Sequence, residues 1–151
     1  MSIISKELTD KIIAAFYDVY YDLGYGFLEN VYQNALYKEL MRRGYACEAQ
    51  KAIEVYHKGD VVGKYYADIL VNNRVILELK SADSLTKTHE SQLMNYLKAT
   101  DIEVGLLLNF GPQPSFKRKV MTVAYKEKYN KNRMTKYGYQ GGNDSVDKDE
   151  E

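Results

Sequence analysis

Apolar residues recur at the three- to four-residue spacing of an amphipathic helix in two stretches near the start of the chain. The first stretch has its apolar residues at Ile12, Phe16, Tyr20 and Leu23. Thr9 or Asp10 is the expected cap at its N-terminus, and Gly24 and Gly26 interrupt the pattern. The second stretch predicts a helix over residues 28–43, with Gly44 as its stop. Its apolar face is expected to comprise Leu28, Val31, Ala35, Leu36 and Leu40.

The period changes after Cys47, where short segments rich in Val, Ile, Leu and Tyr predict β-strands. These segments cover residues 52–56, 63–71 and 74–79. Turn residues separate them, with residues 57–60 in the first connection and Asn72-Asn73 in the second. Such short polar connections predict an antiparallel three-stranded meander.

The following segments predict a further helix and two more strands. The helix is expected over residues 88–100, with Leu93, Tyr96 and Leu97 toward the core. Residues 104–110, VGLLLNF, are nearly all apolar and indicate a strand that is buried on both faces and lies inside the sheet. An edge strand is expected at residues 116–123. This order of elements predicts an α/β sandwich.

Length and composition fit one globular domain: 151 residues, 45% of them hydrophobic, are enough to bury a core without disulfides. Cys47 is the only cysteine, which excludes an internal disulfide and a cysteine-rich zinc site and favours a reducing compartment. No apolar run approaches the roughly 20 residues of a membrane span, and the N-terminus lacks the apolar stretch of a signal peptide. A cytoplasmic protein without membrane contact is therefore expected.

Charge is distributed unevenly along the chain. Residues 111–136 carry eight basic residues and one acidic residue, with interleaved aromatic side chains, and the last fifteen residues are acidic. The basic segment could contact phosphates and stack on bases, although a solvated polar tail is an equal interpretation from Lys126 onward. We therefore expect a folded domain over residues 1–125 and a polar, disordered tail over residues 126–151.

Charged residues also stand where strands should be apolar. Asp68 lies inside YYADILV, and Glu78 and Lys80 lie at the end of VILELK. Buried carboxylates persist when they are paired or bound to a metal, and two converging carboxylates suit Mg²⁺ or Mn²⁺. With Lys80 beside it, such a metal site would suit phosphodiester hydrolysis. The alternative is an ordinary salt-bridge pair at a sheet edge.

A shared site imposes a condition on the loop between the second and third strands. If Asn72-Asn73 formed a two-residue loop, Asp68 would lie opposite Leu77 and point away from Glu78. A three-residue loop over residues 72–74, or a β-bulge, would place Asp68 and Glu78 on the same face. We predict one of these two arrangements.

The spacing of Asp68, Glu78 and Lys80 within this order of elements resembles the signature of the PD-(D/E)xK nuclease superfamily. The segment from Gly26 through Glu29 to Tyr32 resembles the motif that names its GxxExxY family. Ala67-Asp68 stands where the superfamily has Pro-Asp. The resemblance spans residues 8–123 and implies a restriction-endonuclease-like fold with a mixed sheet of four or five strands flanked by helices.

The resemblance also implies roles for individual residues. Asp68 and Glu78 would bind Mg²⁺ or Mn²⁺ with the carbonyl oxygen of Leu79, and Glu29 would be a further acid at the metal. Lys80 would position or activate the water, and Gln92 would hold this lysine or the substrate phosphate. The roles of Tyr32 and Tyr96 are left open, and His89 is expected to be peripheral.

The function implied by this resemblance is metal-dependent hydrolysis of a nucleic acid, and DNA is expected as the substrate rather than RNA. The alternative is a binding module for nucleic acid or protein that keeps the fold without turnover. A homodimer or a protein partner is compatible with either function. The sequence contains no zinc finger or helix-turn-helix that would read a base sequence.

Overall fold

A computed structural model describes residues 4–129, 134–135 and 138–139. The elements, in chain order, are α1 (Lys6–Leu23), α2 (Glu29–Arg42), β1 (Cys47–His57), β2 (Asp60–Val71), β3 (Val75–Lys80), α3 (Lys87–Lys98), β4 (Val104–Phe110), β5 (Pro114–Val120), α4 (Val123–Tyr129), β6 (Met134–Thr135) and β7 (Gly138–Tyr139). Strands β1 to β5 form one sheet in the order β1-β2-β3-β4-β5, and β6 pairs with β7. No helix in the described ranges is long and apolar enough to cross a membrane.

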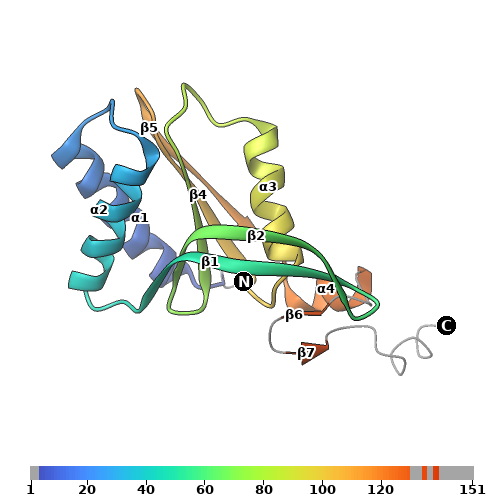
Figure 1. Cartoon of the computed structure of the whole chain (residues 1–151). Helices are drawn as coiled ribbons and strands as arrows, with labels where there is room; N and C mark the ends of the chain where they lie inside the picture. The colour runs from blue at the N-terminus through green and yellow to red at the C-terminus, as the bar shows by residue number, and fades with distance from the viewer. Residues whose placement is uncertain (1–3, 130–133, 136–137, 140–151) are drawn as a thin grey trace.

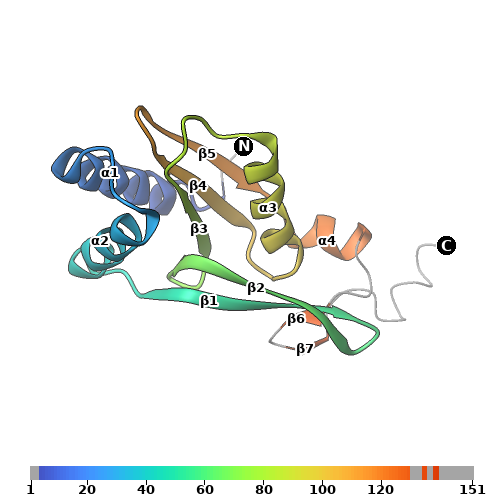
Figure 2. The ribbon, with the colours of Figure 1, turned by 45° about the horizontal axis from the view of Figure 1, so that its top comes forward.

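The sheet is mixed and has helices on both faces. Strands β1, β2 and β3 form the predicted antiparallel meander, β3 pairs with β4 in parallel, and β4 pairs with β5 antiparallel. Figures 1 and 2 show α1 and α2 on one face and α3 on the other. Strand β4 is buried along its whole length between β3 and β5, as its apolar sequence predicts. The predicted α/β sandwich is therefore confirmed, with β5 as an edge strand.

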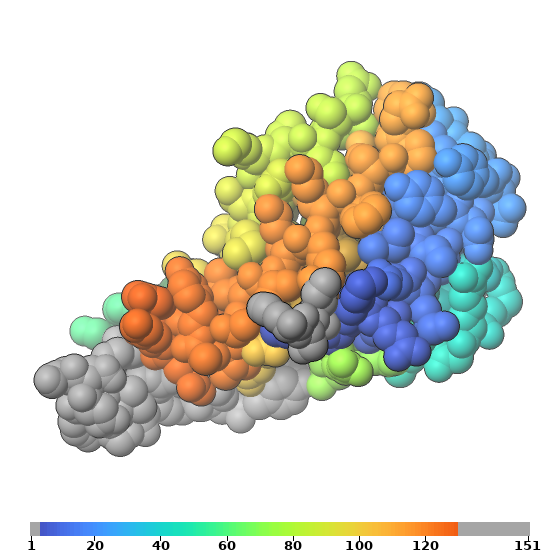
Figure 3. Space-filling model, turned by 180° about the vertical axis from the view of Figure 1, so that it is seen from behind, coloured from blue at the N-terminus to red at the C-terminus, as the bar shows by residue number. Residues whose placement is uncertain are grey.

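Two apolar clusters fill the layers, and the alternation of β3 separates them. Leu77 and Leu79 pack with α1 and α2, whereas Ile76 packs with Leu93 and Tyr96 of α3. Since side chains alternate between faces along a strand, Glu78 and Lys80 belong on the α3 face of β3. From behind, the space-filling view in Figure 3 shows β5 between α1 and α3, with α4 on the side away from α1.

The expected cap of α1 was wrong. The helix begins at Lys6, and Ser5 is its N-cap residue. The Thr9 hydroxyl donates to the Lys6 carbonyl inside the first turn, and Asp10 pairs with Lys6. Thr9 and Asp10 therefore interact with Lys6 in the first turn of the helix. The helix starts about one turn before the expected cap.

The expected apolar face of α2 also needs correction at its first residue. Leu28 precedes the helix as its N-cap and is 76% exposed. The buried residues of the helix are Tyr32, Leu36 and Leu40. Their four-residue spacing places Tyr32, which was not expected on the apolar face, at the end of the buried stripe.

Helix α4 was not among the expected elements, and it crosses the expected start of the tail. The Lys126 side chain is buried, and its ammonium donates to the carbonyl oxygens of Thr100 and Ile102. Burial of a lysine requires such partners, so this residue anchors α4 to the turn after α3. Residues 130–133, 136–137 and 140–151 of the expected tail lie outside the described residues.

The loop after β3 is held against the end of β4. The Asn109 amide accepts from the backbone N–H of Ala82 at 2.9 Å and donates to the Ala82 carbonyl at 3.0 Å. The Tyr20 hydroxyl donates to the Gly111 carbonyl oxygen at 2.8 Å. A Cβ at Gly111 would lie 2.0 Å from the Ala82 carbonyl oxygen, so only glycine fits this approach.

We predict that Gly111→Ala destabilises the protein by about 1–3 kcal/mol, the usual cost of overpacking a close contact. Gly63→Ala is the matched control, because a Cβ there would meet only Val55 at 3.7 Å. The free energy of unfolding from urea denaturation measures both changes. Equal stabilities of the two variants would contradict the close approach at Gly111.

Candidate metal and phosphodiester site

The loop between β2 and β3 has the three-residue form that a shared site requires. Val71 lies opposite Val75, and Ile69 lies opposite Leu77, so the same register carried one residue further brings Asp68 opposite Glu78. Asn72 and Asn73 have φ angles of 51° and 56°, the left-handed conformation that Asn tolerates better than most residues. The predicted three-residue loop is therefore confirmed.

Glu78 is the most deeply buried acid of the predicted site. Glu78 is only 4% exposed, and its side-chain Oε1 atom has no hydrogen-bond partner. Burial raises its pKa to about 8, and the nearby Asp68 carboxylate contributes in the same direction. A buried carboxylate oxygen without a donor is costly, and a bound cation would relieve this cost.

Asp68 is held through both of its carboxylate oxygens. Oδ2 accepts from the backbone N–H of Leu79 at 2.8 Å, and Oδ1 accepts from the Gln50 amide at 3.3 Å. Burial raises the pKa of Asp68, although these two hydrogen bonds oppose the shift. The carboxylate of β2 is thereby fixed directly beside the backbone of β3.

Lys80 and α3 are joined by a chain of polar contacts. The Lys80 ammonium donates to Gln92 Oε1 at 3.3 Å, and the Gln92 amide donates to the Tyr96 hydroxyl at 3.1 Å. Burial, followed by the negative charge of Glu78, raises the pKa of Tyr96 to about 12. The phenol therefore stays protonated at neutral pH and keeps Gln92 oriented toward Lys80.

Glu29 approaches the same region from the first turn of α2. It is exposed, and its Oε2 atom accepts from the backbone N–H of Ser81 at 3.2 Å. Its negative charge raises the pKa values of both Asp68 and Glu78, which places the three carboxylates within electrostatic reach of one another. Side chains from α2, β2, β3 and α3 thus contribute to the region around Asp68 and Glu78.

The donor set fits a divalent cation held by two carboxylates. Within residues 4–129, 134–135 and 138–139, no three His, Cys, Asp or Glu side chains form a group that could hold a metal by themselves. Mg²⁺ commonly uses one or two protein carboxylates and keeps several waters, so a full protein cage is not required. The unpartnered Oε1 of Glu78, next to Asp68, is where such a cation would fit.

Residues that the sequence analysis missed support these groups. Gln50 and Gln33 connect Asp68 to α2, since the Gln50 amide donates to Gln33 Oε1 at 2.8 Å. Nothing in the sequence around either glutamine marked it. Asn109 had a signal, because it is a polar residue within an otherwise apolar buried strand.

The structure gives Tyr32 and His89 structural roles. The Tyr32 hydroxyl donates to the Gly24 carbonyl and accepts from the backbone N–H of Phe27 at 3.2 Å, which ties down the loop before Glu29. His89 forms a capping box with Thr86 at the start of α3. This contact gives His89 a role at the start of α3.

Much of the basic segment that follows β4 is engaged within the protein. Lys119 pairs with Glu90 at 2.6 Å, and Arg118 donates to Thr9 at 3.3 Å and to the carbonyl oxygen of Ile4. Together with the buried Lys126, these contacts stabilise the fold. Several of the charges that were expected to bind phosphate are therefore used in contacts within the protein.

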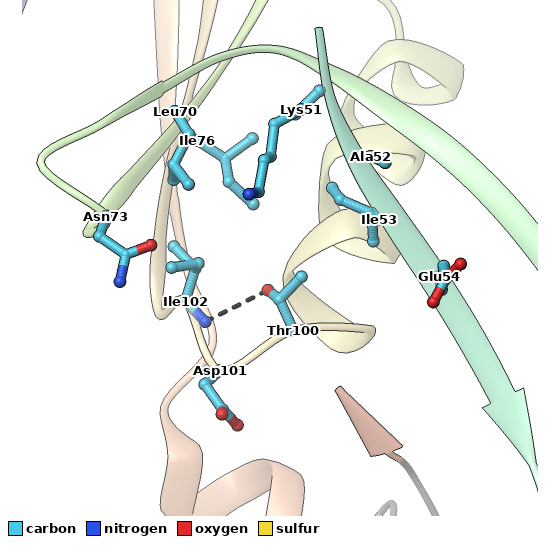
Figure 4. A pocket seen from close by; sticks show the side chains of 11 residues that line it. Lys51, Ala52, Ile53, Glu54, Leu70, Asn73, Ile76, Thr100, Asp101 and Ile102 are labelled. Carbon is cyan, nitrogen blue, oxygen red and sulfur yellow. Dashed lines mark hydrogen bonds between the residues drawn. The ribbon is translucent and has the colours of Figure 1, made fainter. Parts of the chain in front are cut away.

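A separate apolar cavity lies on the β1 side of the sheet. Figure 4 shows it lined by Ile53, Leu70, Ile76 and Ile102, with Lys51 and Asp101 among the polar residues. None of the predicted site residues lines it. The cavity is therefore distinct from the region of Asp68, Glu78 and Lys80.

Comparisons with known proteins bear on this arrangement. The chain is similar to a solved structure titled "Crystal structure of SSO0001", with a TM-score of 0.51 and 19% identity. The match covers 62% of this chain and 50% of that chain, so this chain spans about half the length of that protein and the likeness concerns the fold. No curated protein matches. A family model described as the PD-(D/E)XK nuclease superfamily matches residues 6–125, which comprise helices α1 to α3, the whole five-stranded sheet and the start of α4. The chain therefore belongs to the PD-(D/E)XK nuclease superfamily.

Proposed function

We propose that this protein is a divalent-metal-dependent nuclease that hydrolyses phosphodiester bonds of a nucleic acid, with DNA as the expected substrate. The observation that carries the proposal is the buried Glu78 carboxylate, which has an unpartnered oxygen and lies beside Asp68. An apolar core gives no reason to retain such a group, because removing it would avoid the cost of its burial.

Each residue of the site has a chemical role in this proposal. Asp68 and Glu78 would hold Mg²⁺ or Mn²⁺, which neutralises charge that develops on a phosphoryl oxygen and acidifies water. The Lys80 ammonium orients the attacking water, and Gln92 holds the lysine in place through its Oε1 atom. Glu29 adds negative charge near the two ligands and holds the Ser81 backbone, which follows Lys80.

The loop before Glu29 supports a nucleic acid as the substrate. Tyr25, Phe27 and Leu28 are 56%, 47% and 76% exposed, although Tyr32 fixes the backbone of this loop. Exposed aromatic rings on a fixed backbone form platforms on which bases stack. Because the loop leads directly into Glu29, a strand bound there would pass the candidate site.

Cleavage of labelled single- and double-stranded DNA and RNA, with Mg²⁺, Mn²⁺ or EDTA, tests the proposed function. We expect metal-dependent cleavage that falls about 100-fold or more in Lys80→Ala, because misplacement of a reacting group commonly costs about that much. Lys38→Ala, which removes an exposed lysine of α2, should cleave like the wild type. Binding of nucleic acid without cleavage under any of these conditions would favour the non-catalytic alternative.

The pH dependence of stability tests the burial of Glu78. Its folded-state pKa lies near 8, above the ordinary 4.5, so its favourable contribution is complete below about pH 4.5 and is lost as the pH rises through 8. In EDTA, the unfolding free energy of the wild type should therefore fall by more than about 1 kcal/mol between pH 5 and pH 8. Glu78→Gln should show a flatter profile, and Mn²⁺ should restore the wild type at pH 8. Parallel profiles for the two proteins would show that Glu78 is not desolvated.

The exposed aromatic residues of the loop before Glu29 lead to a prediction about nucleic-acid affinity. Tyr25→Ala should weaken nucleic-acid binding about tenfold, because one base–aromatic contact contributes about 1–3 kcal/mol. Val62→Ala, which removes an exposed apolar side chain of β2 near its turn with β1, is the control and should bind normally. Fluorescence anisotropy with catalytically inactive Lys80→Ala variants measures both affinities. If Tyr25→Ala and the control bind equally well, the loop is not a substrate contact.

A further inference from the structure

We propose that Gln50 is a positioning residue of the metal site, which orients the Asp68 carboxylate and couples it to α2 through Gln33. This inference rests on the proposed function, because it concerns the same pair of metal-binding carboxylates. Neither glutamine belongs to the motif that led to Asp68, Glu78 and Lys80.

The backbone of Gln50 is the first observation. Gln50 lies within β1 and has a φ angle of +52°, in the left-handed region that residues with a Cβ seldom adopt. The other non-glycine residues with positive φ among the described residues lie at a helix N-cap or in turns, namely Ser5, Lys58, Asn72 and Asn73. A strand residue in this conformation carries a conformational cost, and such costs are concentrated at functional sites.

The side-chain alternation of the neighbouring strand β2 changes next to Gln50. Ala49 pairs with Ile69 and Lys51 pairs with Ala67, so Gln50 lies at the level of Asp68. Ala67 and Leu70 belong to the same cluster on the α3 face, whereas Ile69 belongs to the cluster on the other face. Strict alternation would place Ala67 with Ile69. The alternation therefore slips by one residue around Asp68, at the level where Gln50 departs from strand geometry.

The side-chain amide nitrogen of Gln50 donates two hydrogen bonds at the level of Asp68. Its Nε2 atom donates to Gln33 Oε1 at 2.8 Å and to Asp68 Oδ1 at 3.3 Å, which accounts for both amide hydrogens. Gln33 lies four residues after Glu29 on α2, one helical turn along the same face. A single amide thus ties Asp68 of β2 to the helix that also carries Glu29.

The hydrogen bonds at Asp68 leave room for a metal. Gln50 uses one lone pair of Oδ1 and the Leu79 backbone uses one lone pair of Oδ2, and each carboxylate oxygen has a second lone pair. Two donors on opposite oxygens fix the plane of the carboxylate while it can still bind a cation. Groups that orient a ligand in this way commonly change metal affinity by about 10- to 100-fold when they are removed.

The variant Gln50→Gly separates positioning from a structural role. Glycine adopts positive φ without strain, which offsets its larger unfolded-state entropy, so this variant should fold with an unfolding free energy close to that of the wild type. It should bind Mn²⁺ about tenfold or more weakly in isothermal titration calorimetry, the effect typical of outer-shell groups. At saturating Mn²⁺ its kcat for cleavage should stay reduced while the KM for nucleic acid is unchanged.

Two further variants make the test specific. Lys58→Gly changes a residue with the same φ of 52° in the turn between β1 and β2, and it should leave Mn²⁺ affinity unchanged. Gln33→Ala removes the acceptor on α2 but leaves the Gln50–Asp68 contact, so Mn²⁺ affinity should fall by a smaller factor. A Gln50→Gly protein that binds Mn²⁺ as tightly as the wild type would overturn the positioning role and leave the nuclease proposal standing. A wild type that neither binds Mn²⁺ nor cleaves nucleic acid would overturn both.

Discussion

Because three residues connect β2 to β3, Val71 faces Val75 and the register carries Asp68 to the level of Glu78. One residue fewer in this loop would turn every side chain of one strand relative to the other, since side chains alternate between faces. In a regular ladder, a two-residue loop would place Asp68 and Glu78 on opposite faces. The left-handed pair Asn72-Asn73 makes the longer loop possible, and the candidate metal site depends on it.

Two buried carboxylates at one level of the sheet cost free energy, which the rest of the fold must offset. Two carboxylates close together repel each other, and burial removes the water that would otherwise stabilise their charge. The long buried run of β4 and the apolar clusters on both faces provide the hydrophobic burial that tolerates such a site. Gln50 and the Leu79 backbone donate to Asp68, but Glu78 keeps an oxygen without a donor. This oxygen is the one to which we propose that a cation binds.

The segment from Gly26 to Tyr32 joins structure and chemistry within seven residues. Tyr32 is buried against Phe110, and its hydroxyl holds the backbone of the loop that precedes α2. This fixed loop sets the start of the helix at Glu29, whose carboxylate reaches the Ser81 backbone. The spacing of glutamate and tyrosine thus follows from one helical turn: the tyrosine faces the core while the glutamate lies at the site.

The sequence by itself determined the order of the elements from α1 to β5 and the burial of β4, and it pointed to Asp68, Glu78 and Lys80 as candidate site residues, because periodic burial and misplaced charges are local features of a chain. It also showed that a shared site requires a three-residue loop or a β-bulge after Val71. Only the tertiary structure decided that Gln50 and Gln33 connect Asp68 to α2, that Asn109 holds the loop after Lys80, and that Lys126 is buried. These contacts join residues far apart in the chain, or depend on an unusual backbone angle, and no local pattern of residues specifies either.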